Sequence, residues 1–212
     1  MALQFLGLQK TSLIDFPGKL AAVVFTHGCP LRCPFCHNPE LVQGPRPESF
    51  LPAEEVLAFL RKRAKLLGGV VISGGEPLLH ADLAQLIGEI GALGLSVKID
   101  TSGALPRPLA EILRLEAVTY VAMDIKTAPN RYQELGVEWA PVAASMELLR
   151  ASGKVYEFRT TCAPGLAEEA DLAAIGALIR PGERWSRNAF RPGSCLDPAW
   201  NALPHTPADR LA

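Results

Sequence analysis

Three cysteines lie close together in the segment GCPLRCPFCHNPE (28–40), with the spacing C-x3-C-x2-C. Disulfides join cysteines in pairs and a closed zinc site takes four ligands, so a group of three needs another explanation. Soft thiolates are the ligands that zinc and iron–sulfur clusters prefer, although three thiols in a loop can also be ordinary cysteines. The sequence therefore offers either a metal site at Cys29, Cys33 and Cys36 or a loop of unreactive thiols.

The two kinds of metal site differ in what they need besides these cysteines. Zinc requires a fourth ligand, and the candidates are His37, which directly follows Cys36, and His27. Neighbouring residues rarely direct both side chains at one tetrahedral ion, and neither histidine has the spacing of a zinc finger. A four-iron cluster held by three cysteines leaves one iron free to bind a substrate or cofactor. In such a site Phe35 would shield the cluster from water.

A second motif, SGGEP (73–77), follows another predicted strand. Gly74 and Gly75 would expose backbone groups to a ligand, and Glu76 could accept a hydrogen bond from an ammonium group of that ligand. By themselves the two glycines are also typical of a turn, and Glu76 is typical of the start of a helix. The motif gains weight from its position, because it ends one strand just as the cysteine motif ends another.

Strands and helices alternate along the chain. Apolar runs rich in β-branched residues predict strands at 20–28, 69–75, 95–103, 118–126, 154–162 and 183–190. Apolar stripes at helical spacing predict helices at 52–67, 83–93, 108–115, 142–150 and 168–179. Repeated strand–helix units with right-handed crossovers predict an α/β fold, an incomplete (β/α)6 TIM-like barrel. Functional residues of such a barrel gather at the carboxyl ends of its strands, where both motifs lie.

Length and composition suit one domain over residues 1–212, with a proline-rich tail that is expected to be irregular from about residue 191. The proline-rich segment 44–52 is expected to be a surface loop. The 21 Lys and Arg are balanced by 22 Asp and Glu, with no long basic run, which argues against general nucleic-acid binding. The N-terminus does not resemble a signal peptide and no apolar run is long enough to cross a membrane, so we expect a cytoplasmic protein.

The cysteine motif C-x3-C-x-F-C, followed by GGEP after the second predicted strand, resembles the radical S-adenosylmethionine (SAM) superfamily. The segments SLIDFPG (12–18), CHNPE (36–40) and FRPGSCLDPAW (190–200) are similar to glycyl-radical-enzyme activating proteins, most closely those of anaerobic ribonucleoside-triphosphate reductase. The resemblance implies that Cys29, Cys33 and Cys36 hold a [4Fe-4S] cluster whose open iron binds SAM. It also implies reductive cleavage of SAM to a 5′-deoxyadenosyl radical, which generates a glycyl radical on the partner enzyme.

The resemblance also assigns residues near SAM. The segment Asp100 to Gly103 resembles a strand-end motif beside the cofactor, which implies contacts from Thr101 and Ser102. Asp124 and Lys126 resemble an Asp-x-Lys motif that approaches the methionine carboxylate, and Arg159 matches an arginine that reaches the cofactor. Without the family, these three side chains could equally be a strand-end ion pair and a surface charge.

Some features depart from the family or leave other functions open. His205 does not align with the histidine that lies near adenine in pyruvate formate-lyase activators, so no adenine contact is assigned. No second cysteine group lies between Pro39 and Gly74, which implies an external electron donor such as flavodoxin or ferredoxin. Cys162 and Cys195 are expected to be structural thiols. The alternatives are a radical SAM enzyme with a small substrate, such as 7-carboxy-7-deazaguanine synthase, and a non-catalytic zinc or iron–sulfur binding module.

Overall fold

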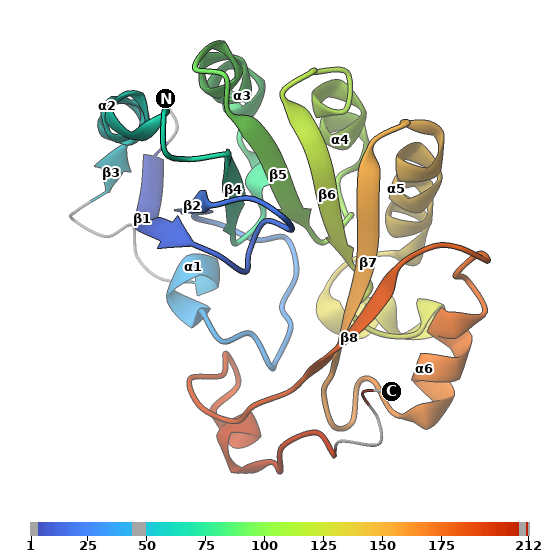
Figure 1. The fold of residues 1–212 in the computed structure, drawn as a ribbon. Coiled ribbons are helices and arrows are strands. Elements are labelled where there is room, and N and C mark those ends of the chain that lie inside the picture. Colours follow the sequence, from blue (N-terminus) through green and yellow to red (C-terminus); the bar gives the residue numbers. More distant parts are fainter. Residues whose placement is uncertain (1–3, 44–49, 208–210, 212) are drawn as a thin grey trace.

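The fold is built on one curved sheet, seen in a computed structural model that describes residues 4–43, 50–207 and 211 (Figure 1). The strand order is β3-β1-β2-β4-β5-β6-β7-β8. Strands β2 and β4 to β8 run parallel, whereas β1 pairs antiparallel with both β2 and β3. The strands are β1 Gln4–Ser12, β2 Ala21–Thr26, β3 Leu51–Pro52, β4 Gly69–Gly74, β5 Ser96–Thr101, β6 Val118–Asp124, β7 Val155–Cys162 and β8 Trp185–Ala189.

The parallel strands are those predicted from the sequence, and they form the predicted incomplete barrel. Strand β2 illustrates why the prediction succeeds, because its apolar run is buried on both faces of the sheet. Strands β1 and β3 were not predicted. β1 lies near the edge of the sheet and mixes polar with apolar residues, and β3 has only two residues, so neither carries a clear strand pattern. Among the described strands, β8 does not pair back onto β1 or β3, so the barrel is open on one side.

Helices cover the outer face of the sheet (Figure 1). The apolar stripes of α2 and α3 pack in one core with outward residues of β4 and β5, such as Val70, Ile72, Val97 and Ile99. This packing confirms the predicted helices, whose ends shift by a few residues, and adds the short helix α1. The helices are α1 Pro39–Gln43, α2 Ala53–Arg63, α3 Leu83–Ala92, α4 Pro106–Ile112, α5 Trp139–Ala151 and α6 Glu169–Gly176.

The loop between β1 and β2, which contains SLIDFPG, closes the end of the barrel where the parallel strands begin. Phe16 is buried inside the barrel, and its ring packs edge-on against Tyr120 with centroids 6.2 Å apart. A Cβ atom on Gly69 would lie 2.7 Å from the same ring, so the first residue of β4 must be small. This segment, singled out for its likeness to activating proteins, thus has a structural role far from the cysteines.

The rest of the chain adds little regular structure. Residues 44–49 of the predicted surface loop lie outside the described residues. In the tail, residues 191–207 form turns and bends around one short 3-10 helix, η3 (Pro198–Ala202), as expected for a proline-rich segment. None of the helices that the structure describes is long and apolar enough to cross a membrane.

Candidate active site

A cavity of about 580 Å³ lies where β4 to β7 end, beside the cysteine loop. All the predicted site residues except Glu76 line this cavity. The lining residues are Cys29, Leu31, Cys33, Phe35, Cys36, Val42, Ser73, Gly74, Gly75, Asp100, Thr101, Ser102, Asp124, Lys126 and Arg159.

The three clustered cysteines come from the loop that follows β2. Gly28, with φ of +88°, adopts a left-handed conformation that turns the chain into this loop. Cys33 is buried, Cys29 and Cys36 are partly buried, and none of the three forms a disulfide. No fourth cysteine and no histidine is among the described residues that line the cavity. Three soft sulfur donors of this kind fit a [4Fe-4S] cluster with one open iron.

Burial controls the protonation of these thiols. It raises the pKa of Cys33 to about 12, with Lys126 opposing the rise and the two neighbouring thiols adding to it. Burial likewise raises the pKa of Cys29. The bare site therefore holds Cys29 and Cys33 as protonated thiols, and metal binding must release their protons.

Gly74 and Gly75 are required because the backbones of β2 and β4 approach closely where the two strands end. A Cβ atom on Gly75 would lie 2.1 Å from the carbonyl oxygen of Gly28, and one on Gly74 would lie 2.3 Å from the nitrogen of Thr26. Gly75 N–H donates to Thr26 O at 2.9 Å, and the next N–H, that of Glu76, donates to Gly28 O at 2.7 Å. These glycines therefore fix the start of the cysteine loop as well as exposing backbone to the cavity.

Glu76 lies elsewhere than expected, fully buried behind the wall of the cavity. Its Oε1 accepts hydrogen bonds from the Thr101 hydroxyl at 2.9 Å and from Leu78 N–H at 3.2 Å. Its Oε2 accepts from Ser102 N–H at 2.8 Å and from the Ser102 hydroxyl. A carboxylate has about four lone-pair positions, so these four donors leave no acceptor for the ammonium of a ligand. Glu76 is thus a positioning residue that holds Thr101 and Ser102 in the cavity wall.

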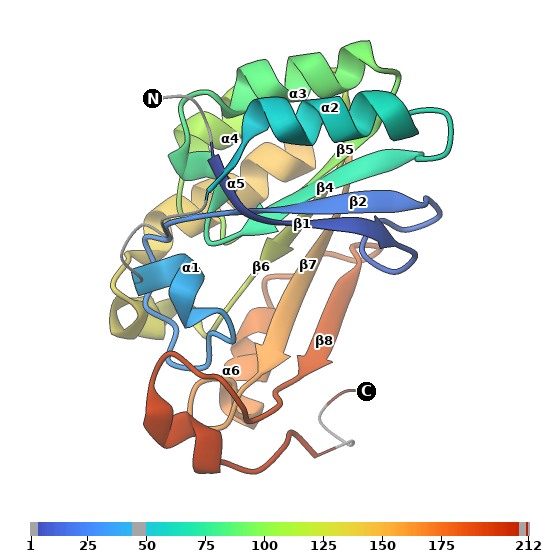
Figure 2. The ribbon, with the colours of Figure 1, turned by 90° about the vertical axis from the view of Figure 1, so that its left-hand side faces the viewer.

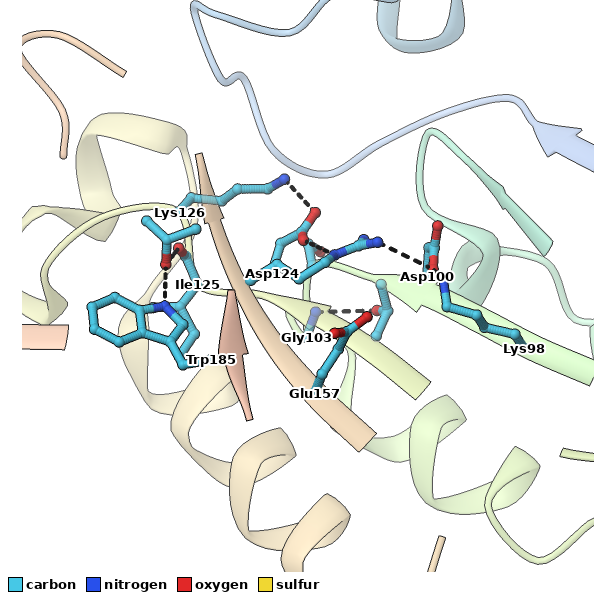
Figure 3. A network of polar contacts seen from close by, with 12 residues as sticks. Lys98, Asp100, Gly103, Asp124, Ile125, Lys126, Glu157 and Trp185 are labelled. Carbon is cyan, nitrogen blue, oxygen red and sulfur yellow. Dashed lines mark hydrogen bonds and ion pairs between the residues drawn. The ribbon is translucent and has the colours of Figure 1, made fainter. Parts of the chain in front are cut away.

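A row of alternating charges runs along the inner face of the sheet from the cavity (Figure 3). Lys126 Nζ lies 2.7 Å from Asp124 Oδ2, and Arg159 Nε lies 2.8 Å from Asp124 Oδ1. Asp100 Oδ1 lies 3.5 Å from an Arg159 nitrogen and 2.5 Å from Lys98 Nζ. Lys126 Nζ has three N–H donors and bonds Asp124 through one of them, so it can also donate to an anionic group in the cavity, such as the carboxylate of a bound amino acid.

The charge state of this row follows from its pairing. Although burial disfavours the ionised carboxyl, Arg159 and Lys126 together hold the pKa of Asp124 well below its usual value. Burial would lower the pKa of Lys126, but Asp124 outweighs it and raises that pKa. Both groups are therefore charged at neutral pH, and Lys126 enters any reaction as a fixed cation.

Two members of the row were not predicted as site residues. Asp100 belongs to a motif noted in the sequence but was given no role, and it lines the cavity. Lys98, the ion-pair partner of Asp100, is buried at 2% exposure. Both occupy the polar positions of a strand whose alternate residues, Val97 and Ile99, are buried in the outer core. This alternation in the sequence could have identified the two residues, because it places Lys98 and Asp100 together on the inner face of the sheet.

The two histidines considered as zinc ligands have other contacts. The His37 ring stacks on Phe190 with centroids 6.0 Å apart, and the His27 ring lies edge-on to Phe50 at 6.0 Å. Neither histidine is among the described residues that line the cavity with the three cysteines. The structure thus gives no support to a zinc site built from a histidine and the three cysteines.

Comparison with known proteins places these residues in a wider context. The sequence profile of the Radical SAM superfamily matches residues 23–174. A Methanocaldococcus jannaschii protein, provisionally named as a glycyl-radical enzyme activating enzyme, is 30% identical over 93% of this chain and 84% of its own. The pyruvate formate-lyase-activating enzyme of Staphylococcus epidermidis is 38% identical over 82% of this chain and 74% of its own.

Solved structures agree with the fold. The crystal structure of Streptococcus suis SuiB bound to S-adenosylmethionine superimposes with a TM-score of 0.62 at 18% sequence identity. The match covers 79% of this chain and 39% of SuiB. At this identity the likeness concerns the fold alone, and it agrees with the incomplete barrel.

Proposed function

Because the chain belongs to the radical SAM superfamily, among its glycyl-radical-enzyme activating enzymes, we propose that it generates the glycyl radical of an anaerobic ribonucleoside-triphosphate reductase. Its cofactors are a [4Fe-4S] cluster and SAM, which when bound supply a 5′-deoxyadenosyl radical that removes a hydrogen atom from the partner. Cys29, Cys33 and Cys36 would hold the cluster. The other residues of the cavity would bind and orient SAM.

The observation that carries the proposal is the meeting of three thiols, a glycine backbone and a row of paired charges, with Lys126 at its end, in one cavity. Lys126 would bind the methionine carboxylate through a charge-assisted hydrogen bond. Asp124 contacts both Lys126 and Arg159 and so keeps the two cations in place. Thr101 and Ser102, held by Glu76, add hydroxyl groups to the same wall.

The cavity also keeps water from the reacting groups. Phe35 lines it and is only 5% exposed, and Leu31 and Val42 supply further buried apolar surface. Lys126 Nζ lies 6.0 Å from the centre of the Phe35 ring, so the cation is partly covered by an aromatic face. Excluding water in this way protects a reactive species from side reactions.

The choice of a protein substrate is supported by the open side of the barrel. Among the described strands, β8 leaves a free edge, with which an extended segment of another protein can pair. The likeness of SLIDFPG, CHNPE and FRPGSCLDPAW to the reductase activators supports the choice of partner. Because Cys162 and Cys195 do not line the cavity, we assign the electron to an external donor such as flavodoxin or ferredoxin in the cytoplasm.

The test combines the reduced, reconstituted protein with SAM and a candidate partner without oxygen. With an anaerobic ribonucleotide reductase, electron paramagnetic resonance should detect a stable carbon-centred radical, split into a doublet by the glycine α-hydrogen. The signal should disappear when the partner glycine is changed to alanine. A radical that forms only on pyruvate formate-lyase would overturn the choice of reductase and keep the activating function.

A different result would overturn the protein substrate itself. If no glycyl-radical enzyme acquires a radical while a purine-like small molecule stimulates 5′-deoxyadenosine formation, the substrate is a metabolite. Failure to cleave SAM at all, with the cluster fully assembled, would contradict the proposal as a whole.

A further inference from the structure

The C-terminal tail lies against the loop that carries the cluster cysteines, at the bottom of the view in Figure 2. Leu196 N–H donates to Cys36 O at 2.9 Å, and Asp197 N–H donates to Pro34 O at 3.0 Å. These bonds join segments about 160 residues apart in sequence. The tail is therefore fixed to the cysteine loop through backbone groups.

Side chains reinforce this contact. Leu31, Cys33 and Phe35 of the cysteine loop share a buried apolar cluster with Phe190 and Cys195, and Trp200 packs against that cluster. The Trp200 ring lies 6.1 Å from the Phe35 ring and 6.0 Å from the Phe190 ring, measured between centroids. Aromatic pairs at this spacing attract one another beyond the area they bury. Phe35 thus faces the cavity and is supported from behind by Trp200.

The two backbone bonds also orient the peptide groups of the cysteine loop. In a trans peptide the C=O and N–H bonds point in opposite directions, and no cis peptide occurs in the described chain. Because Pro34 O and Cys36 O point toward the tail, the N–H groups of Phe35 and His37 point away from it. These two bonds therefore fix the peptide groups at Phe35 and His37, with their N–H groups on the side of the loop away from the tail.

We infer that the tail segment Cys195–Trp200 is the outer shell of the cluster site, with Asp197 and Trp200 as positioning residues. N–H groups near cluster sulfurs raise the reduction potential, and burial of the site slows loss of the metal. The tail thereby tunes the potential through Asp197 N–H and protects the cluster through Trp200. The inference depends on the cluster at the three cysteines and is independent of which partner protein is activated.

The first test removes one backbone donor. Asp197→Pro eliminates the N–H that bonds Pro34 O, and Asp197→Ala is its matched control, because both variants lose the side-chain cap to Ala199 N–H at 3.0 Å. We expect a more negative midpoint potential of the cluster in Asp197→Pro than in Asp197→Ala, measured by redox titration with electron paramagnetic resonance. Equal potentials in the two variants would refute the orienting role.

The second test removes the aromatic support. Trp200→Ala should lower the affinity for the cluster about 10- to 100-fold, as is usual for outer-shell partners of a metal site. The rate of iron transfer to a chelator without oxygen measures this loss. Trp200→Phe should restore retention, because a smaller ring still packs on Phe35. The protective role would be overturned if Trp200→Ala kept its iron as well as the unmodified protein. It would also be overturned if Trp200→Phe failed to restore iron retention although the metal-free variants unfold at the same urea concentration.

Discussion

Replacing Glu76 separates a structural role from direct binding of the cofactor. Glu76→Ala removes a fully buried carboxylate and leaves four donors without a partner, two of them backbone N–H groups. Each unsatisfied buried donor costs about 1 to 3 kcal/mol, but relaxation and water entry make such costs less than additive. Together, the four unsatisfied donors should cost about 3 to 5 kcal/mol. We expect this loss in the free energy of unfolding, out of a total of about 5 to 15 kcal/mol.

Urea unfolding of the reduced, metal-free protein, followed by circular dichroism, measures this change without SAM or the cluster. Glu76→Gln keeps one carbonyl acceptor and the volume of the side chain, so its loss should be smaller, about 1 to 3 kcal/mol. Glu134→Ala is the matched control, because Glu134 is exposed and pairs with Arg131 at 2.8 Å on the surface. Its expected effect is at most about 1 kcal/mol.

The same variants distinguish the two possible roles of this residue. If Glu76 positions Thr101 and Ser102, Glu76→Ala must lower stability in the absence of SAM and also weaken SAM binding. If Glu76 instead accepted a hydrogen bond from the SAM ammonium, Glu76→Gln would weaken SAM binding and leave the metal-free protein unchanged. The latter result would refute the positioning role.

Four further predictions concern the cluster, the cavity and the acid stability of the fold. Replacing any one of the three cluster cysteines with alanine should abolish assembly of about four irons and four sulfides per chain, whereas Cys162→Ala should retain them in iron and sulfide analysis; retained iron in a cluster variant would contradict the assignment. Gly75→Ala places a Cβ 2.1 Å from a backbone oxygen, whereas ordinary contact begins near 3.4 Å. The cysteine loop must then move by about 1 Å, so SAM cleavage should slow about 100-fold. An unchanged rate would show that the loop accommodates the added methyl group without harm to the site. Lys126→Met should weaken SAM binding roughly 10- to 150-fold in equilibrium dialysis, the equivalent of about 1.5 to 3 kcal/mol, and unchanged affinity would exclude it from the site. Hydrogen bonding from Arg150 lowers the pKa of Glu183 from 4.5 to about 2. This pair therefore stabilises the fold above pH 4.5 and loses its effect as the pH falls toward 2. Glu183→Gln should reduce the dependence of the free energy of unfolding on pH in this range, and an unchanged dependence would contradict the linkage.

The sequence predicted the parts of the fold whose signals are local and strong. Runs such as LAAVVF at 20–25 are buried on both faces of the sheet, so hydrophobicity alone marks them as strands. Parallel strands bring their carboxyl ends to one edge, so motifs at several strand ends were expected to meet. For this reason Cys29, Gly74, Thr101 and Lys126, from four separate segments, line one cavity as expected.

Other features depend on contacts that no local pattern encodes. The role of Glu76 follows from donors at the end of β5 and in the segment after β4, which a single motif cannot reveal. Strand β1 was missed because only part of it enters the core, although Phe5 is fully buried. The tail was expected to be irregular, and it is, but irregular sequence gives no indication of which surface it covers. Its contact with Cys36 through Leu196 N–H is visible only in three dimensions.

The cysteine motif and the SGGEP motif are connected by hydrogen bonds in the folded protein. Glu76 contributes its backbone N–H to Gly28 O beside the first cluster cysteine, and its carboxylate to Ser102 in the cavity wall. A single residue thus connects the end of β2, where the cysteine loop begins, to the end of β5, where Thr101 and Ser102 line the cavity. Leu196 and Asp197 hold the same loop from the opposite side. Because the loop is bonded on both sides, we expect a displacement of the β4 loop to shift the three cysteines relative to the cavity wall.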